Sequence, residues 1–210
     1  MAWVAFALYL LGIATVGGLR TYLHYRETGD TGHRLRPTFG TVEWWAWLLM
    51  AAALLLGALA PLLAATHVTR PIALFDHPAI AVAGLVLALA GFAGVLTAQQ
   101  AMGASWRVGV DPTERTELVT DGPFARVRNP IFSAMITATV GLTAMVPSWP
   151  QLLGLACLIA GIQIQVRAVE EPYLTRTQGS AYTAYTHRAG RFLPRIGRRH
   201  PHATTQAHTT

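Results

Sequence analysis

The chain has 210 residues, of which 52% are hydrophobic and 12% are charged. An ordinary soluble domain carries about 25% charged residues, so this composition excludes a typical water-soluble protein and indicates a chain solvated by lipid. The formal net charge of +6 lies beside apolar blocks, and we attribute it to membrane topology and anionic lipid headgroups. No nucleic-acid-binding motif accompanies it, so nucleic acid is not an expected partner.

Long apolar blocks predict the membrane spans, because about 20 apolar residues cross a hydrocarbon core. In chain order the blocks run from Ala2 to Leu19, Trp44 to Ala65, Ala79 to Ala98, Ile131 to Val146 and Gln151 to Gln165. The last two are short, and Pro147 and Pro150 around their junction predict an antiparallel helical hairpin. The expected fold is an all-α polytopic membrane bundle of about five spans that ends in this hairpin.

Arginines predict how the bundle is oriented, since all 16 basic residues are arginines. Fifteen of them follow the first, third or fifth apolar block, and Arg70 alone lies on the opposite side. By the positive-inside rule, the amino terminus is expected outside and the carboxyl terminus in the cytoplasm. The arginine count also supports an odd number of spans.

The connections divide the chain into three predicted regions: membrane helices over residues 1–98, a region with the hairpin over 99–197, and a disordered tail over 198–210. The segment from Arg20 to Glu43 is expected to be a turn-rich loop. The segment from Gln99 to Pro130 is longer than a helix connection requires, which is typical of a functional loop. The tail histidines are attributed to a solvated segment, so no metal site is expected.

Polar residues flank the predicted hairpin on both sides. Asn129 and Pro130 precede its first helix, where they are typical of a helix start. Arg167, Glu170 and Glu171 follow its second helix and share a face if that helix continues, so a structural ion pair is one interpretation. A functional site is the other, because two adjacent carboxylates near a helix carboxyl end oppose the macrodipole and repel each other.

In this region the chain resembles the isoprenylcysteine carboxyl methyltransferase and phospholipid methyltransferase family. The similarity rests on three motifs: Leu118-Val119-x-x-Gly122-Pro123-Phe124, then Arg128-Asn129-Pro130-x-Phe132, then Glu170-Glu171-x-x-Leu174-x4-Gly179-x2-Tyr182-x2-Tyr185-x5-Arg191-x2-Pro194. Members of the family usually carry His and Tyr where this chain has Asn129 and Phe132. The segment from Met102 to Arg107 is similar to bacterial members, which indicates a bacterial plasma membrane.

The resemblance implies a methyltransferase that uses S-adenosylmethionine, with the cofactor between the hairpin and the cytoplasmic segments. The cofactor-binding residues that it implies are Leu118, Val119, Phe124, Arg128, Asn129, Pro130, Phe132, Glu170 and Glu171. Tyr182 and Tyr185 are assigned to the substrate, with interfacial anchoring as the alternative. Arg167 and Arg191 are the expected catalytic residues, because an arginine can orient an acceptor carboxylate.

The expected acceptor is a lipophilic or lipidated molecule that reaches the site from the bilayer, whose lipids are expected partners. A carboxylate acceptor is favoured, since it is already a nucleophile and needs no general base. Two alternatives remain open: an NADPH-dependent membrane reductase of the sterol type, and a non-enzymatic accessory protein that binds a partner through the Gln99 to Pro130 loop. The sequence does not identify the acceptor or the oligomeric state.

Overall fold

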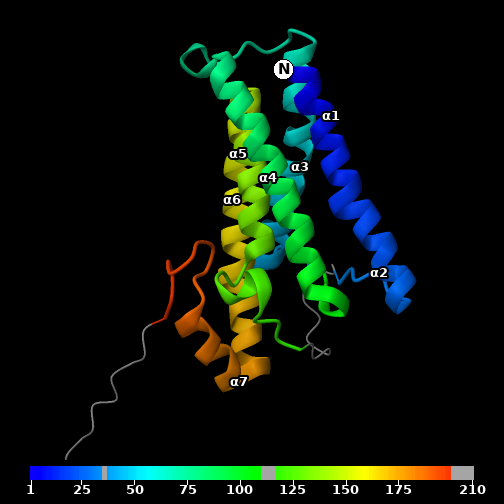
Figure 1. The fold of residues 1–210 in the computed structure, drawn as a ribbon, viewed down its shortest axis with the longest axis vertical. Coiled ribbons are helices and arrows are strands. Elements are labelled where there is room, and N and C mark those ends of the chain that lie inside the picture. Colours follow the sequence, from blue (N-terminus) through cyan, green and yellow to red (C-terminus); the bar gives the residue numbers. More distant parts are fainter. Residues whose placement is uncertain (35–36, 110–116, 200–210) are drawn as a thin grey trace, which may run out of the picture.

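The computed structural model describes residues 1–34, 37–109 and 117–199, and long helices dominate it (Figure 1). The α-helices are α1 (Ala2–Ile13), α2 (Arg20–Thr28), α3 (Val42–Ala65), α4 (Pro78–Met102), α5 (Pro130–Met145), α6 (Trp149–Ile164) and α7 (Glu171–Arg188). Two π-helical turns, η1 (Ala14–Leu19) and η5 (Gln165–Glu170), join α1 to α2 and α6 to α7. Short 3₁₀ turns cover Ala73–Phe75, Gly103–Ser105 and Gly122–Ala125.

The predicted bundle and its terminal hairpin are confirmed. Four helical stretches of the described chain are long and apolar enough to cross a membrane, and α5 is a shorter apolar helix of 16 residues. Helix α5 ends at Met145 and α6 begins at Trp149, with Pro150 in its first turn. Proline suits that position because its missing N–H has no helical partner there.

The first helix departs from the prediction because it does not end at Leu19. It continues through η1 and α2 to Thr28, so the expectation of a loop from Arg20 onward was wrong for these nine residues. Helix α2 is polar, and helices of this length are stabilised mainly by tertiary packing. Its buried side chains, Arg20 and His24, supply that packing.

Small residues divide the bundle into two closely packed helix pairs. Helix α4 packs along α5, and α3 packs along α6. A Cβ atom built on Gly91 of α4 would lie 2.3 Å from the backbone nitrogen of Ala138 in α5. A Cβ atom on Gly161 of α6 would lie 2.9 Å from the carbonyl oxygen of Ala46 in α3. Such small-residue stripes bring helix backbones together where no hydrophobic effect drives association.

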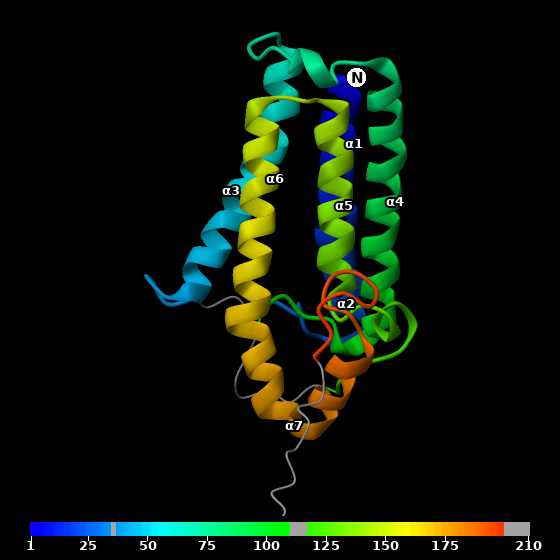
Figure 2. The same cartoon turned by 90° about the vertical axis from the view of Figure 1, so that its left-hand side faces the viewer.

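The two helices of the hairpin therefore have different partners. Below their shared turn α5 and α6 run apart (Figure 2), and the surface on which they touch is small compared with the surfaces within each pair. Helix α1 closes one side of the space between the pairs. The ring of Tyr9 covers Gly57 of α3, and the ring of Phe92 from α4 covers Gly12 of α1.

Most arginines lie at one end of this bundle, which we call the site end because it also holds the predicted site residues. Helices α2 and α7 and the start of α5 lie there, whereas the amino terminus and the α5–α6 turn lie at the far end (Figure 1). Among the described residues, Arg70 lies in the connection between α3 and α4, and that connection is at the far end (Figure 1). Most of the predicted disordered tail, residues 200–210, lies outside the described residues.

Candidate active site

A cavity of about 570 Å³ lies between the two helix pairs, within the range of small-molecule sites. Helices α1, α3, α4, α5 and α6 all contribute to its wall. Gln151 lines it near the start of α6, and Glu170 lines it beyond the end of the same helix. At 1.5 Å per helical residue these two positions are about 28 Å apart, so the cavity follows the bundle axis through most of the membrane part.

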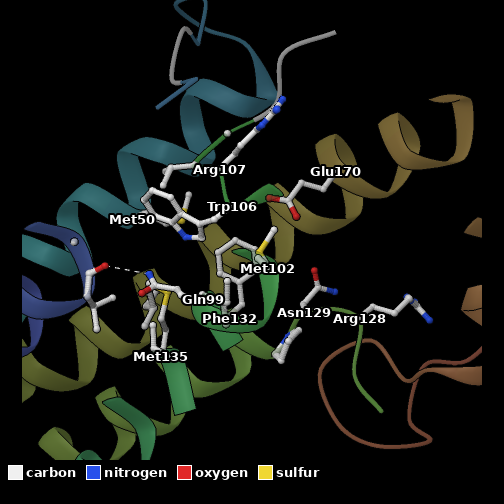
Figure 3. A pocket seen from close by; sticks show the side chains of 18 of the residues that line it. Met50, Gln99, Met102, Trp106, Arg107, Arg128, Asn129, Phe132, Met135 and Glu170 are labelled. Carbon is white, nitrogen blue, oxygen red and sulfur yellow. Dashed lines mark hydrogen bonds between the residues drawn. The ribbon is translucent and has the colours of Figure 1, made fainter. Parts of the chain in front are cut away.

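The cavity has two chemically different parts. Its membrane part, which we call the apolar arm, is lined mainly by aromatic and aliphatic side chains, among them Tyr9, Met50, Phe92, Met135, Leu142 and Leu158. The part at the site end, which we call the polar head, is lined by Glu117, Arg128, Asn129, Glu170, Tyr173 and Gln178. Figure 3 looks into the region where the two parts meet, around Met102, Trp106 and Phe132. Such a shape suits an elongated amphipathic ligand.

All the residues of the predicted cofactor set line this cavity. They are Leu118, Val119, Phe124, Arg128, Asn129, Pro130, Phe132, Glu170 and Glu171. Tyr182 and Tyr185, which were assigned to the substrate, line it as well. The hairpin thus brings together residues that are far apart in the sequence.

Glu170 presents a carboxylate to the cavity. It ends the π-helical turn η5, and its side chain points across the cavity toward Trp106 (Figure 3). Its hydrogen-bond partner is Gln165, whose Nε2 lies 3.5 Å from Oε1, a long distance for such a bond. Among the residues that the structure describes, no cation pairs with Glu170. The carboxylate is therefore placed to accept a cationic group of a ligand.

Glu171 is the centre of a buried ion network. Its Oε1 accepts hydrogen bonds from Arg128 Nη2 at 2.9 Å and from Arg191 Nε at 2.7 Å, while its Oε2 accepts one from Arg191 Nη2 at 2.9 Å. Arg199 adds a more distant contact at 3.6 Å. Arg128 also donates to the Ala189 carbonyl at 2.7 Å. The network connects the segment after α7 to the start of α5 through Glu171.

The two predicted catalytic arginines do not line the cavity. The guanidinium of Arg191 is held by Glu171 in two hydrogen bonds, which raise the pKa of Arg191 above its ordinary value. Arg167 is exposed, and its Nε donates to Gln163 one turn earlier at 2.7 Å. The ion pair with Glu170 or Glu171, one of the two interpretations of the sequence, is not formed: Glu171 pairs with Arg128 and Arg191, and the Arg167 side chain bonds to Gln163 instead.

Asn129 connects the start of α5 to the carboxyl-terminal segment. It occupies the N-cap position, but its side chain makes no capping hydrogen bond. Its Nδ2 instead donates to the carbonyl of Arg191 at 3.0 Å, and Ser133 Oγ donates to the carbonyl of Phe192 at 2.6 Å. The helix-cap interpretation of Asn129 is thus wrong as regards its side chain. These bonds close one wall of the polar head.

Comparison with protein families matches residues 79–181 to the phospholipid methyltransferase family. This part of the chain belongs to that family. The match begins in α4 and ends in α7, so it contains the hairpin and both glutamates. A comparison with curated proteins finds no match. The protein is an integral membrane protein with a methyltransferase region.

Two tyrosines that follow directly after the residues matched to the phospholipid methyltransferase family pack against each other in the cavity wall. Tyr182 and Tyr185 are buried, with ring centroids 6.3 Å apart in an edge-on arrangement. The hydroxyl of Tyr185 donates to the carbonyl of Phe124 at 2.7 Å. Through this hydrogen bond, Tyr185 holds the backbone of Phe124 in the cavity wall.

The phospholipid methyltransferase region does not build the cavity alone. Helices α1 and α3, which precede the matched residues, contribute Tyr9, Gly12, Trp47 and Met50 to the lining. The sequence interpretation missed these residues, because a side chain that faces a cavity inside a membrane bundle is as apolar as one that faces lipid. Gln99 differs from these mostly apolar lining residues because its side chain is polar. It is a buried amide at the end of α4, and its Nε2 donates to the carbonyl of Val16 in η1 at 3.0 Å (Figure 3).

Proposed function

We propose that the protein is an S-adenosylmethionine-dependent methyltransferase that acts on a lipophilic acceptor, with a carboxylate as the methylated group. The observation that carries this proposal is a single cavity that joins the carboxylate of Glu170 to an apolar arm at membrane depth. The family match supports methyl transfer over the reductase and the accessory protein that the sequence left open. The cavity shape supports an amphipathic acceptor.

The polar head fits the groups of S-adenosylmethionine. Glu170 offers a carboxylate for its ammonium group. Arg128 has a buried Nε without a hydrogen-bond partner in the described structure, and this donor fits the cofactor carboxylate. Phe124 and Phe132 offer aromatic walls for the adenine. When bound, the cofactor would supply an electrophilic methyl group.

The apolar arm fits the hydrocarbon chain of the acceptor. Its walls come from five helices and hold few polar atoms, so a chain inside it is protected from water. A chain in the arm would place its polar group at the junction with the polar head. A carboxylate there needs no deprotonation. The protein contributes to the reaction by positioning this carboxylate and by excluding water from it.

Replacing Glu170 with glutamine tests the cofactor site. The variant keeps the size of the side chain and removes its charge, so the affinity for S-adenosylmethionine should fall about tenfold or more. Isothermal titration calorimetry on the purified protein measures this. Glu27→Gln, on the exposed face of α2, is the matched control and should bind as the wild type does. Equal affinity in all three proteins would remove Glu170 from the site.

Filling the apolar arm tests the acceptor site. Thr139 lines the cavity about 14 Å along α5 from Pro130, so Thr139→Phe should block a long chain. We expect binding of N-acetyl-S-farnesylcysteine to weaken about tenfold or more, because added ring atoms overlap the ligand, while a short-chain S-alkyl analogue and S-adenosylmethionine bind normally. Calorimetric titration of each ligand measures this.

The matched control for this variant is Thr137→Phe. Both threonines make the same hydrogen bond to the carbonyl four residues earlier, at 2.9 Å, but Thr137 does not line the cavity. It should bind long and short chains as the wild type does. Equal effects of the two substitutions would show that the arm does not hold the acceptor chain.

The identity of the methylated group has its own test. Membrane extracts are incubated with the protein and methyl-labelled S-adenosylmethionine, and the lipid products are treated with alkali. A methyl ester releases labelled methanol, whereas a methylated amine or thioether keeps its label. Release of the label is the expected result. Retention of the label would show that the methylated group is not a carboxylate, and it would not affect the proposed cofactor site.

The arginines at the site end also support the proposed topology. With the amino terminus outside, the site end and the polar head face the cytoplasm, where S-adenosylmethionine is available. Cysteine labelling by a membrane-impermeant reagent tests this, with new cysteines at Thr28 and Val68 in a Cys157→Ala background. Labelling of intact cells at position 68 and not at position 28 is the expected pattern.

A further inference from the structure

Trp106 stands where the polar head meets the apolar arm. It lies in the segment after α4, is 3% exposed, and lines the cavity. Met50 and Met102 line the same cavity, and the carboxylate of Glu170 points toward the ring (Figure 3). A ligand that extends from one part of the cavity into the other passes this ring.

Two buried side chains of α2 hold this ring from behind. The guanidinium carbon of Arg20 lies 5.4 Å from the ring centroid, a cation–π distance. The His24 ring meets it edge-on, with centroids 5.4 Å apart and planes at 71°. Arg20 Nη2 also donates to the carbonyl of Gly103 at 2.9 Å. Helix α2 thus holds both the ring and the start of the segment that carries it.

The loop after α2 holds the same segment on its other side. A Cβ atom on Gly32 would lie 3.0 Å from the Trp106 ring, so the glycine permits the loop to pass close to it. Val108 donates its backbone N–H to the Gly32 carbonyl at 2.9 Å, and Arg34 donates its own to the Val108 carbonyl at 2.9 Å. Trp106 is therefore held between α2 and this loop.

Stability alone is a poor explanation for Arg20 and His24. Arg20 is 8% exposed and His24 is 2% exposed, and in the described structure Arg20 Nε and His24 Nδ1 are buried without hydrogen-bond partners. Leaving such groups unsatisfied is costly. Neither residue lines the cavity, so neither touches a ligand there. Their contacts converge on Trp106.

We infer that Arg20 and His24 are positioning residues that fix Trp106 at the junction, so that the polar end of the acceptor stops beside Glu170 while its chain enters the apolar arm. This inference rests on the proposed function. It assigns a role in the reaction to the first helix, which lies outside the residues that match the family. Trp106 acts on the acceptor directly, and Arg20 and His24 act through it.

Kinetics of variants in α2 test the inference. Arg20→Met keeps the length of the side chain and removes the cation and the bond to Gly103. If N-acetyl-S-farnesylcysteine is methylated, kcat for it should fall about tenfold or more, since small misplacements of reacting groups are costly. The affinity for S-adenosylmethionine should stay within about twofold, because Arg20 is outside the polar head. His24→Ala should act alike, and His24→Phe should restore most of the rate by restoring a ring edge.

Arg26→Met is the matched control, because Arg26 lies on the same helix over the ring of Tyr22, at 6.0 Å, and Tyr22 is exposed. This variant should keep the wild-type kcat. Equal losses in Arg20→Met and Arg26→Met would overturn the inference. So would an unchanged rate in Arg20→Met, or failure of His24→Phe to exceed His24→Ala when the unfolding midpoints of the two are the same.

A spectroscopic measurement decides the inference without turnover. Bromine quenches tryptophan fluorescence on contact, so a brominated palmitate in the cavity should quench the fluorescence of Trp106. The quenching in the wild type minus the quenching in Trp106→Phe gives the share of the quenching that comes from Trp106. That share should fall in Arg20→Met and persist in Arg26→Met. If the share is absent in the wild type, or is unchanged in Arg20→Met, the inference fails. Failure of the proposed function appears separately, as absence of S-adenosylmethionine binding by the wild type.

Discussion

Replacing Glu171 with glutamine should lower the free energy of unfolding by about 3–5 kcal/mol, the usual loss when one partner of a buried ion pair is removed. The substitution leaves the Arg128 side chain, which is 2% exposed, without its carboxylate. It also releases Arg191, which anchors the segment after α7. Equilibrium unfolding in mixed micelles with increasing SDS measures the change.

The neighbouring carboxylate provides the control for this experiment. Glu170→Gln removes the same charge one residue earlier, where no cation of the described chain is paired with it. Its unfolding free energy should stay within about 0.5 kcal/mol of the wild type, although it binds S-adenosylmethionine more weakly. The two adjacent glutamates thus have opposite expected effects on stability and on binding. Equal destabilisation by the two substitutions would contradict the assignment of Glu171 to structure and Glu170 to the ligand.

Replacing Gly91 with alanine should separate α4 from α5 and lower the free energy of unfolding by about 1–3 kcal/mol, the range for overpacking a close contact. The new Cβ atom would lie 2.3 Å from the Ala138 nitrogen and 2.6 Å from its Cα. These are backbone atoms, so the contact is relieved only by moving a whole helix. The same unfolding measurement applies.

Gly18→Ala is the control for Gly91→Ala because it makes the same chemical change in a helical segment. A Cβ atom on Gly18 meets no atom within 4 Å. Alanine favours helix by about 1 kcal/mol over glycine, so Gly18→Ala should be neutral or slightly stabilising. A loss of stability at position 18 as large as that at position 91 would show that the cost does not come from the α4–α5 contact.

The fold was largely predictable because membrane spans and their proline-marked turn are encoded locally. Apolar blocks gave the helices, and Pro147 and Pro150 gave the hairpin, which the structure confirms. The continuation of the first helix to Thr28 was not predictable in this way. It depends on the burial of Arg20 and His24 against Trp106, which lies 80 or more residues later in the chain. The sequence around these polar residues does not indicate that they pack against such a distant residue.

The candidate site was predictable only in the part that motifs describe. The motifs and the hairpin together indicated the residues that line the polar head. They gave Glu170 as the cofactor contact and Glu171 as its support, but they did not predict the ion network of Glu171, because its arginine partners come from segments far away in the sequence. They assigned Arg191 to the acceptor, whereas the fold places a buried carboxylate beside it. The sequence did not indicate the apolar arm, because the residues that face the arm and the residues that face lipid are equally apolar.

The pairing of α6 with α3 limits how freely such a methyltransferase region can be joined to other sequences. The family match covers α4 to α7, yet the groove over Gly154 and Gly161 of α6 is filled by α3, which precedes the match. A chimaera that joins residues 79–181 to foreign membrane helices would expose this groove to lipid unless a new helix had a matching surface. We therefore expect that the matched residues fold only together with α3 or with a helix whose surface fits the same groove.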